Sequence, residues 1–129
     1  MPQNPLIETT KIANGALTAK AAIVLDNNNK ANLPAGVNAD RFGGVCQAAA
    51  ADGAPARIAV AGIVEVVAKA AFNPGERLTT ADNLGKVQKI GAVAGTIYYV
   101  IGIAMEAAGA DGDIVEMLIA PQTINAAVS

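Results

Sequence analysis

The chain has 129 residues, which is the size of one compact domain. Its formal net charge is −2, and it contains no histidine. Its nine lysine and arginine residues are scattered, which argues against nucleic-acid binding, and its longest apolar run, residues 97–105, is too short to span a bilayer. Hydrophobic residues make up 53% of the chain but aromatic residues only 3%, and such a thin core favours burial against copies of the same chain.

The chain is expected to begin with an extended arm. Prolines at positions 2 and 5 fix the backbone and remove donors, so residues 1–10 are predicted to be extended rather than helical. Leu6 and Ile7 give this arm apolar side chains to bury on a partner. The start lacks the basic and apolar segments of a signal peptide, so we expect a protein made and kept in a cytosol or in a particle assembled there.

The next part of the chain predicts two strands, a loop and a longer strand. Residues 17–25 end like a strand, although their composition also suits a helix. Asp26 and the three asparagines after it favour a turn into a second strand, because Asn and Asp bond to their own backbone. A loop over 33–44 follows. Residues 57–68 are rich in β-branched side chains, which indicates a strand, and Gly62 within them predicts a bulge or bend.

In the second part of the chain, turn residues again separate the predicted strands. An Asn-Pro-Gly turn at 73–75 and a tight turn at 82–86 precede a buried strand over 96–104. Residues 113–120 alternate well enough to form the last strand. Pro121 is expected to end it, because proline cannot donate a hydrogen bond to a strand ladder.

One pattern occurs twice in this sequence. The stretches GGVCQAAAADGAPARIAVA and IGIAMEAAGADGDIVEMLIA align so that Gly44 matches Gly102, and upstream Leu17 matches Phe72. Each half of the chain is therefore predicted to contain a hairpin, a loop, a strand, an alanine-rich turn and a second strand, in that order. Such a unit cannot bury its apolar face alone, so two copies are expected to pack together.

The predicted fold is therefore mainly β, a small β-barrel or sandwich built from two similar half-repeats, with at most one or two short helices. The predicted organisation is an extended N-terminal arm over 1–15, a β domain over 16–120 with half-repeats of about 16–68 and 69–120, and a C-terminal tail over 121–129. The alanine runs at 48–51 and 106–110 favour a helical turn or a short helix by propensity. A fold of long helices is the rival, and the frequent Gly, Asp and Asn residues argue against it.

The chain carries few residues of the kind that enzymes use. Without histidine there is no histidine base and no typical zinc site, and with one cysteine there is no thiolate cluster and no internal disulfide. Cys46 reads as a small buried hydrophobe rather than a reactive thiol. Asp111 and Asp113 flank a glycine but lack the further ligands of a calcium loop. No catalytic residue, cofactor or metal is therefore predicted.

The Gly-Lys pair at 85–86 does not form a phosphate-binding P-loop. Thr80 stands where a glycine is required, and Val87 rather than Ser or Thr follows the lysine. An enzyme with a carboxylate-only site stays open as an alternative, although nothing in the sequence brings two acids together. The acids available for it are Asp40, Glu76, Asp82, Asp111 and Asp113.

Three residues are predicted to contact a neighbouring subunit. Tyr98 and Tyr99 are adjacent on a predicted strand and so point to opposite faces. One ring is expected in the core and the other at a subunit interface, where amphipathic rings are enriched. Glu65 lies inside the apolar strand 57–68, where a carboxylate is costly unless it faces solvent or pairs with a cation of a neighbouring subunit. The predicted subunit contacts are therefore Tyr98, Tyr99 and Glu65.

Three stretches give the chain a family resemblance: NPLIETTKIANGALTAKAAIVLD, GGVCQAAAADGAPARIAVAGIVEV and VIGIAMEAAGADGDIVEMLIA. In their order and spacing they resemble tailed-phage capsid cement proteins, which are also called head decoration proteins. The resemblance covers roughly residues 4–120 and rests on Gly, Ala and Val motifs. Members are sometimes labelled as RecA/RadA-type recombinases, a label that the failed P-loop at Lys86 does not support.

The resemblance implies a mostly-β protein that binds the outer surface of the expanded capsid as a homotrimer, contacts the major capsid protein and stabilises the shell. It implies a location on the virion after synthesis in the host bacterial cytoplasm, and no nucleic-acid or membrane partner is expected. The arm is then the predicted capsid contact, through Pro2, Asn4, Pro5, Leu6, Ile7 and Thr9. The alternative is a carbohydrate- or receptor-binding β module of a virion surface fibre, although the chain is poor in the aromatic residues that sugar sites use.

Overall fold

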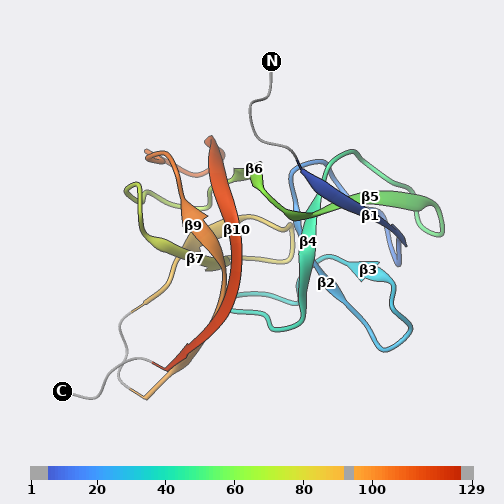
Figure 1. Cartoon of the computed structure of the whole chain (residues 1–129), viewed down its shortest axis with the longest axis horizontal. Coiled ribbons are helices and arrows are strands. Elements are labelled where there is room, and N and C mark those ends of the chain that lie inside the picture. Colours follow the sequence, from blue (N-terminus) through green and yellow to red (C-terminus); the bar gives the residue numbers. More distant parts are fainter. Residues whose placement is uncertain (1–5, 92–94, 126–129) are drawn as a thin grey trace.

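The computed structural model describes residues 6–91 and 95–125, and within them the chain consists of strands, turns and loops (Figure 1). The predicted mainly-β class is confirmed. The described part of the chain has no helix that is long and apolar enough to cross a membrane. The strands are β1 (Ile7–Ile12), β2 (Ala22–Leu25), β3 (Ala31–Asn32), β4 (Phe42–Cys46), β5 (Pro55–Ala61), β6 (Ile63–Val67), β7 (Arg77–Thr80), β8 (Val87–Lys89), β9 (Ile97–Ala104) and β10 (Ile114–Asn125).

The strands form two five-stranded antiparallel sheets that pack as a small sandwich. The first sheet has the order β1-β5-β4-β2-β3, and the second has the order β6-β10-β9-β7-β8. Each strand of the first sheet therefore has a counterpart five strands later in the chain, which confirms the prediction of two similar halves. Figure 1 shows the two sheets side by side, with β1, β5 and β4 on one side and β9, β10 and β7 on the other.

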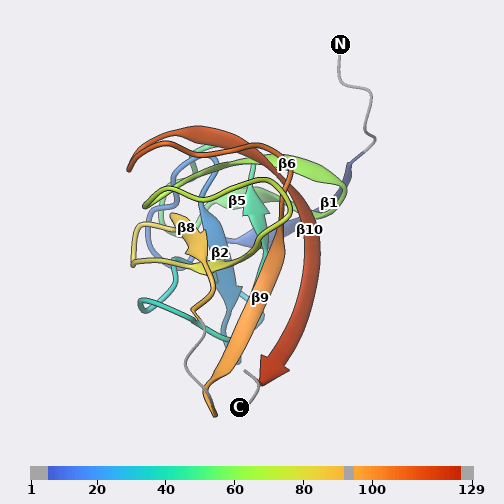
Figure 2. The same cartoon turned by 90° about the vertical axis from the view of Figure 1, so that its left-hand side faces the viewer.

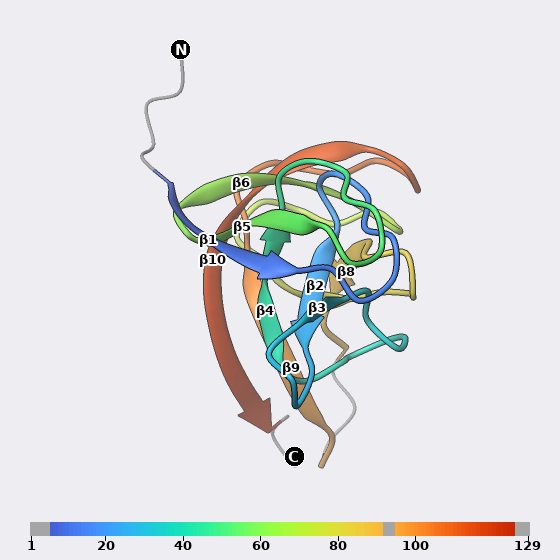
Figure 3. The ribbon, with the colours of Figure 1, turned by 90° about the vertical axis from the view of Figure 1, so that its right-hand side faces the viewer.

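The bridges between the loops and the strands repeat as well. In each half, the end of the first strand meets the third strand, so each sheet curls back on itself (Figure 3). The paired bridges are Ala13–Ala31 and Ala68–Val87, which are parallel, and Leu17–Ala50 and Phe72–Ala108, which are antiparallel. Because Leu17 and Phe72 align in the sequence, the internal repetition reflects a repeated architecture.

The alanine-rich segments form no helix in the described residues, so the expectation of a helical turn or short helix was wrong. Ala50 exchanges two backbone hydrogen bonds with Leu17, at 2.8 and 3.0 Å, and Ala108 does the same with Phe72, at 3.2 and 3.0 Å. Helix propensity contributes at most a few tenths of a kcal/mol per residue, roughly, and tertiary pairing readily overrides it.

An aspartate organises each of the two predicted tight turns. Asp26 Oδ1 accepts hydrogen bonds from the backbone N–H groups two and four residues ahead, at 2.8 and 3.0 Å. Asp82 Oδ1 accepts the corresponding pair at 3.0 and 3.2 Å. In both halves the carboxylate thus satisfies donors that the turn would leave unpaired.

The predicted strand over 57–68 is divided between the two sheets. β5 ends at Ala61 and β6 begins at Ile63, and Gly62 between them has a φ of 108°, a value that favours glycine. The N–H of Ile119 donates to the Gly62 carbonyl at 3.0 Å and holds the bend in place. Gly62 is therefore the point at which the chain passes from the first half to the second.

Pro121 does not end the last strand, in contrast to the prediction. β10 continues to Asn125, and its pairing with β9 shifts register between Ile119 and Gln122. A bulge leaves residues out of the ladder, so the missing N–H of proline costs no hydrogen bond there. As a result, β9 and β10 form a long curved ribbon that reaches beyond the other strands (Figure 2).

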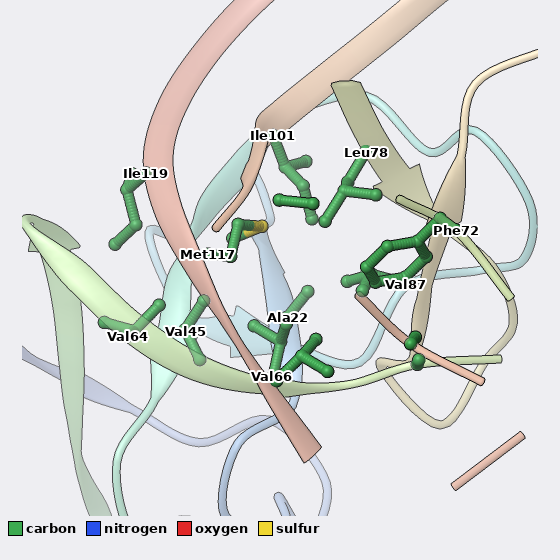
Figure 4. Packing of buried hydrophobic residues seen from close by; sticks show 14 of the residues in the cluster. Ala22, Val45, Val64, Val66, Phe72, Leu78, Val87, Ile101, Met117 and Ile119 are labelled. Atoms are coloured by element: carbon green, nitrogen blue, oxygen red, sulfur yellow. The ribbon is translucent and has the colours of Figure 1, made fainter. Parts of the chain in front are cut away.

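The two sheets share one apolar core (Figure 4). Neighbouring residues of the first sheet point to opposite faces, as the strand geometry requires. One face contributes Ala22, Val45 and Ala59 to the shared core, where they meet Val64, Val66, Phe72, Leu78, Val87, Ile101, Met117 and Ile119 of the second half. The other face forms a second cluster that includes Leu17, Ile23, Ala31, Ile58 and the fully buried Cys46.

A group of polar side chains also joins the two halves. Asn38 Nδ2 donates to the Ile97 carbonyl, and Asn38 Oδ1 accepts the N–H of Tyr99, both at 2.8 Å. The amide side chain therefore takes the place of a partner strand along β9. The Asn38 N–H donates to the Thr80 carbonyl at 2.9 Å, and the buried Thr79 hydroxyl donates to the Tyr99 carbonyl at 2.7 Å.

Gly44 and Gly102, which align in the sequence repeat, meet the same steric requirement. A Cβ atom at Gly44 would collide with the carbonyl oxygen of Ala59, and one at Gly102 would collide with the carbonyl oxygen of Leu118. Ala59 and Leu118 hold equivalent places on β5 and β10, which neighbour these glycines. Each half thus brings two strands together more closely than a side chain allows.

Replacing either glycine with alanine should destabilise the fold. We expect Gly44→Ala and Gly102→Ala each to lower the free energy of unfolding by about 3 kcal/mol, because backbone rather than a flexible side chain must move. Gly36→Ala is the control, since a Cβ there would meet no atom within 4 Å. Urea unfolding measures the three values, and wild-type stability of Gly102→Ala would contradict the shared requirement.

Candidate interaction surfaces

One end of the molecule exposes apolar side chains around the start of β1. Of the predicted arm contacts, Leu6 is 36% exposed, Ile7 is 63% exposed and Thr9 is half-buried. The others, Pro2, Asn4 and Pro5, lie outside the described residues. Ile7 and Thr9 belong to a strand that the sequence analysis missed, although the β-branched residues of IETTKI were a usable signal.

β1 is an edge strand whose ladder partner is β5. Charged side chains line it: Glu8 pairs with Arg57 at 3.1 Å, and Lys11 Nζ donates to Asn29 Oδ1 at 2.9 Å. Charges on an edge strand discourage unregulated pairing with other chains. This end therefore combines the exposed side chains of Leu6 and Ile7 with a strand edge that carries charged side chains.

Tyr98 and Tyr99 differ in burial, as their alternation on a strand predicted. Tyr98 is only 8% exposed and belongs to the core of its own chain, where its hydroxyl lies against Gly91. Tyr99 is half-buried and borders a groove at the surface. Of the two, Tyr99 is the ring that another molecule reaches more easily.

The groove beside Tyr99 has a volume of about 250 Å³ and lies between the start of β4 and the β9–β10 ribbon. Nothing in the sequence indicates this groove, because the segments that form it are far apart in the chain. Its lining residues are Arg41, Phe42, Tyr99, Val100, Pro121, Gln122 and Thr123. The exposed Arg41 donates to Asn27 Oδ1 at 2.7 Å, and no carboxylate of the described residues forms an ion pair with it.

Glu65 lies on the outer face of β6, away from this groove. Its carboxylate is exposed and sits 3.8 Å from Lys20 Nζ of the same chain, directly across from Glu116 on β10. Tyr99 pairs with Thr123 much farther along β10, roughly 20 Å away at about 3.3 Å per strand residue. The structure therefore does not bring the predicted subunit contacts Tyr99 and Glu65 into one patch.

A second groove, of about 330 Å³, lies at the junction of the two halves. Its walls are mostly apolar, and Leu84 beside it is 56% exposed. The residues that line it are Thr18, Ala19, Lys20, Ala21, Leu33, Val67, Leu84, Gly85 and Lys86.

A small ionic network lies next to this junction groove. Lys86 Nζ contacts Asp111 Oδ1 at 2.8 Å, and Lys69 Nζ lies 3.6 Å from Asp82 and 3.9 Å from Asp111. The hydrogen bond from Lys86 lowers the pKa of Asp111 below its ordinary value, and the same bond raises the pKa of Lys86. A carboxyl held ionised in this way is a structural anchor, whereas acid catalysis needs a raised pKa.

The other titratable groups with shifted pKa values are also structural. The Lys30 and Asn32 hydrogen bonds hold the pKa of Asp26 below its ordinary value, which fits its place in a turn. Burial raises the pKa of the Cys46 thiol, so the reactive thiolate form is disfavoured. Among the described residues, no group of three or more Cys, Asp and Glu side chains could hold a metal ion.

Comparisons with known proteins place this fold among phage structural proteins. A protein-family model described as phage cement protein matches residues 1–119. The chain belongs to the phage cement protein family, and it is a structural component of the phage virion. A search of curated proteins finds no match.

A solved structure confirms the fold independently. The N base of the head fiber gp8.5 in bacteriophage phi29 matches with a TM-score of 0.60 and 19% sequence identity, over 90% of this chain and 95% of that chain. Identity at this level demonstrates a shared fold and nothing finer.

The lowered pKa values of Asp26 and Asp111 predict acid sensitivity. Their folded-state pKa values lie below the ordinary 3.8, so the stability they contribute is complete above that pH and is lost as the pH falls through the lowered values. We expect the free energy of unfolding of Asp26→Asn to fall less between pH 5 and about pH 2 than that of the wild type. Asp40→Asn is the control, because no hydrogen bond or ion pair within the described part of the chain holds Asp40. Equal acid sensitivity of Asp26→Asn and wild type would contradict the assignment.

Proposed function

We propose that this protein is a capsid decoration protein that binds the outer surface of the expanded capsid as a homotrimer, contacts the major capsid protein and stabilises the shell. Membership of the phage cement protein family carries the proposal. The described surface supports it, because its distinctive features are exposed apolar side chains and an available strand edge rather than an acid–base pair with raised pKa values. We propose accordingly that the protein acts by binding and not by catalysis.

The proposed mechanism is thermodynamic linkage. A protein that binds only the expanded lattice adds RT ln(1 + [L]/Kd) to the stability of that lattice, which is about 2.7 kcal/mol per site at one hundred times Kd. A trimer that engages several capsid subunits at once gains avidity from weak individual contacts. Strong chemistry at any single residue is therefore unnecessary.

Binding to capsids tests the proposal directly. Purified protein should co-sediment saturably with undecorated expanded heads and not with unexpanded proheads, and its plateau should be a multiple of three per lattice site. Light scattering should give a trimer in solution, and decorated heads should melt at a higher temperature than bare heads. Absence of binding to both kinds of particle would overturn the decoration function and direct attention to a glycan or receptor screen.

We also propose the N-terminal arm, Pro2 to Thr9, as one of the capsid contacts. Ile7–Ile12 pair with β5, so a deletion that tests the arm without removing a strand must stop before Ile7. Deleting residues 2–6 should leave the melting temperature of the domain within about 2 °C of wild type, because β1 (Ile7–Ile12) keeps its pairing with β5, and should weaken binding to expanded heads at least tenfold. Full decoration by the truncated protein would show that the contact lies elsewhere.

A further inference from the structure

A protein that clamps two neighbours needs contact surfaces at two separate places. The start of β1 and the far end of the β9–β10 ribbon lie at opposite ends of the molecule in all three views (Figures 1, 2 and 3). The exposed Leu6 and Ile7 mark the first end. The groove that contains Tyr99 and Thr123 lies along the ribbon, toward the second end.

The free edge of β10 borders this second end. β6 pairs with β10 only from Ile114 to Leu118, while β9 pairs with the opposite edge as far as Asn125. Beyond Ile119, which bonds to Gly62, no described strand covers the edge that β6 leaves. Unpaired backbone of this kind accepts an extended peptide as an added strand.

The positive charge of Arg41 in the groove favours a ligand that carries a carboxylate. Arg41 is exposed, carries the only formal charge among the lining residues and has no carboxylate partner in the described part of the chain. Gln122 and Thr123 supply polar groups, and Tyr99 and Pro121 supply apolar surface beside them. Phe42 packs against the shared core, so its ring is not a free platform for stacking a sugar.

The arm of a second copy is a poor occupant for this groove. Its residues 2–7, PQNPLI, contain no aspartate or glutamate, and its one acid, Glu8, already pairs with Arg57 of its own chain at 3.1 Å. Charge complementarity therefore points to an extended segment of a different protein that carries at least one acidic residue.

We infer that the groove between β4 and the β9–β10 ribbon binds an extended, acidic segment of the major capsid protein, with a carboxylate on Arg41 and backbone along the free edge of β10. This inference rests on the proposed decoration function. It makes the protein a bridge whose two contacts lie at opposite ends of one chain.

Charge reversal in the groove tests the inference. Arg41→Glu should weaken binding to expanded heads at least tenfold, because it places like charges opposite each other. Arg77→Glu is the matched control, an exposed β7 arginine outside the groove with the same change in net charge, and it should bind within about twofold of wild type. Thr123→Glu, at an exposed position of the same groove, should reproduce the loss if Arg41→Glu folds poorly. Unchanged binding of a folded groove variant overturns the inference, whereas failure of the wild type to bind heads overturns the decoration function itself.

Cross-linking identifies the occupant. A photoreactive residue introduced at Gln122 should cross-link, on expanded heads, to a peptide of the major capsid protein that contains Asp or Glu. Cross-links solely to a second copy of this chain, a changed oligomeric state of Arg41→Glu, or specific capture of a glycan by the groove would each overturn the inference.

Discussion

The apolar core between the two sheets is the interaction on which the rest of this structure depends. Each half contributes one face of a five-stranded sheet, and many of the side chains that meet are alanine and valine. Small side chains bury little area each, at about 25 cal/mol per Å², so the core stabilises the fold only if the backbones approach closely. Within each sheet, Gly44 and Gly102 let neighbouring strands lie close together, since a Cβ at either position would strike the carbonyl oxygen of the adjacent strand.

The shared core also decides where the surfaces of the protein lie. The chain crosses from one sheet to the other at Gly62, and Asn38 ties a loop of the first half to β9 of the second. With the halves held in this way, the start of β1 and the end of the β9–β10 ribbon project at opposite ends (Figure 1). This geometry leaves one exposed surface at each end, and the proposed bridging of two neighbours would use both.

Most of the charged side chains discussed above stabilise turns and contacts between elements of the fold. Asp26 and Asp82 organise equivalent turns, and the Lys86–Asp111 pair fastens a turn of the second half beside the junction. Two of the carboxylates considered for a catalytic site, Asp82 and Asp111, do come together, but Lys69 lies between them, 3.6 Å from Asp82 and 3.9 Å from Asp111. Arg41 stands apart from this pattern, because it faces a groove with no acidic partner in the described residues.

The sequence by itself determined the β class, the two similar halves, the turns at Asp26 and Asp82, the bend at Gly62 and the burial of Cys46, because local propensity and internal repetition encode these features. Tertiary structure decided the rest. The alanine runs form backbone hydrogen bonds with Leu17 and Phe72 instead of the helix that their propensity favours. The bulge near Pro121 allows β10 to continue past the proline. The groove at Tyr99 joins segments from three distant parts of the chain, and Tyr99 and Glu65 proved to be far apart along β10. Spacing in a sequence carries local geometry, whereas the position of one strand beside another depends on how the sheets close on their shared core.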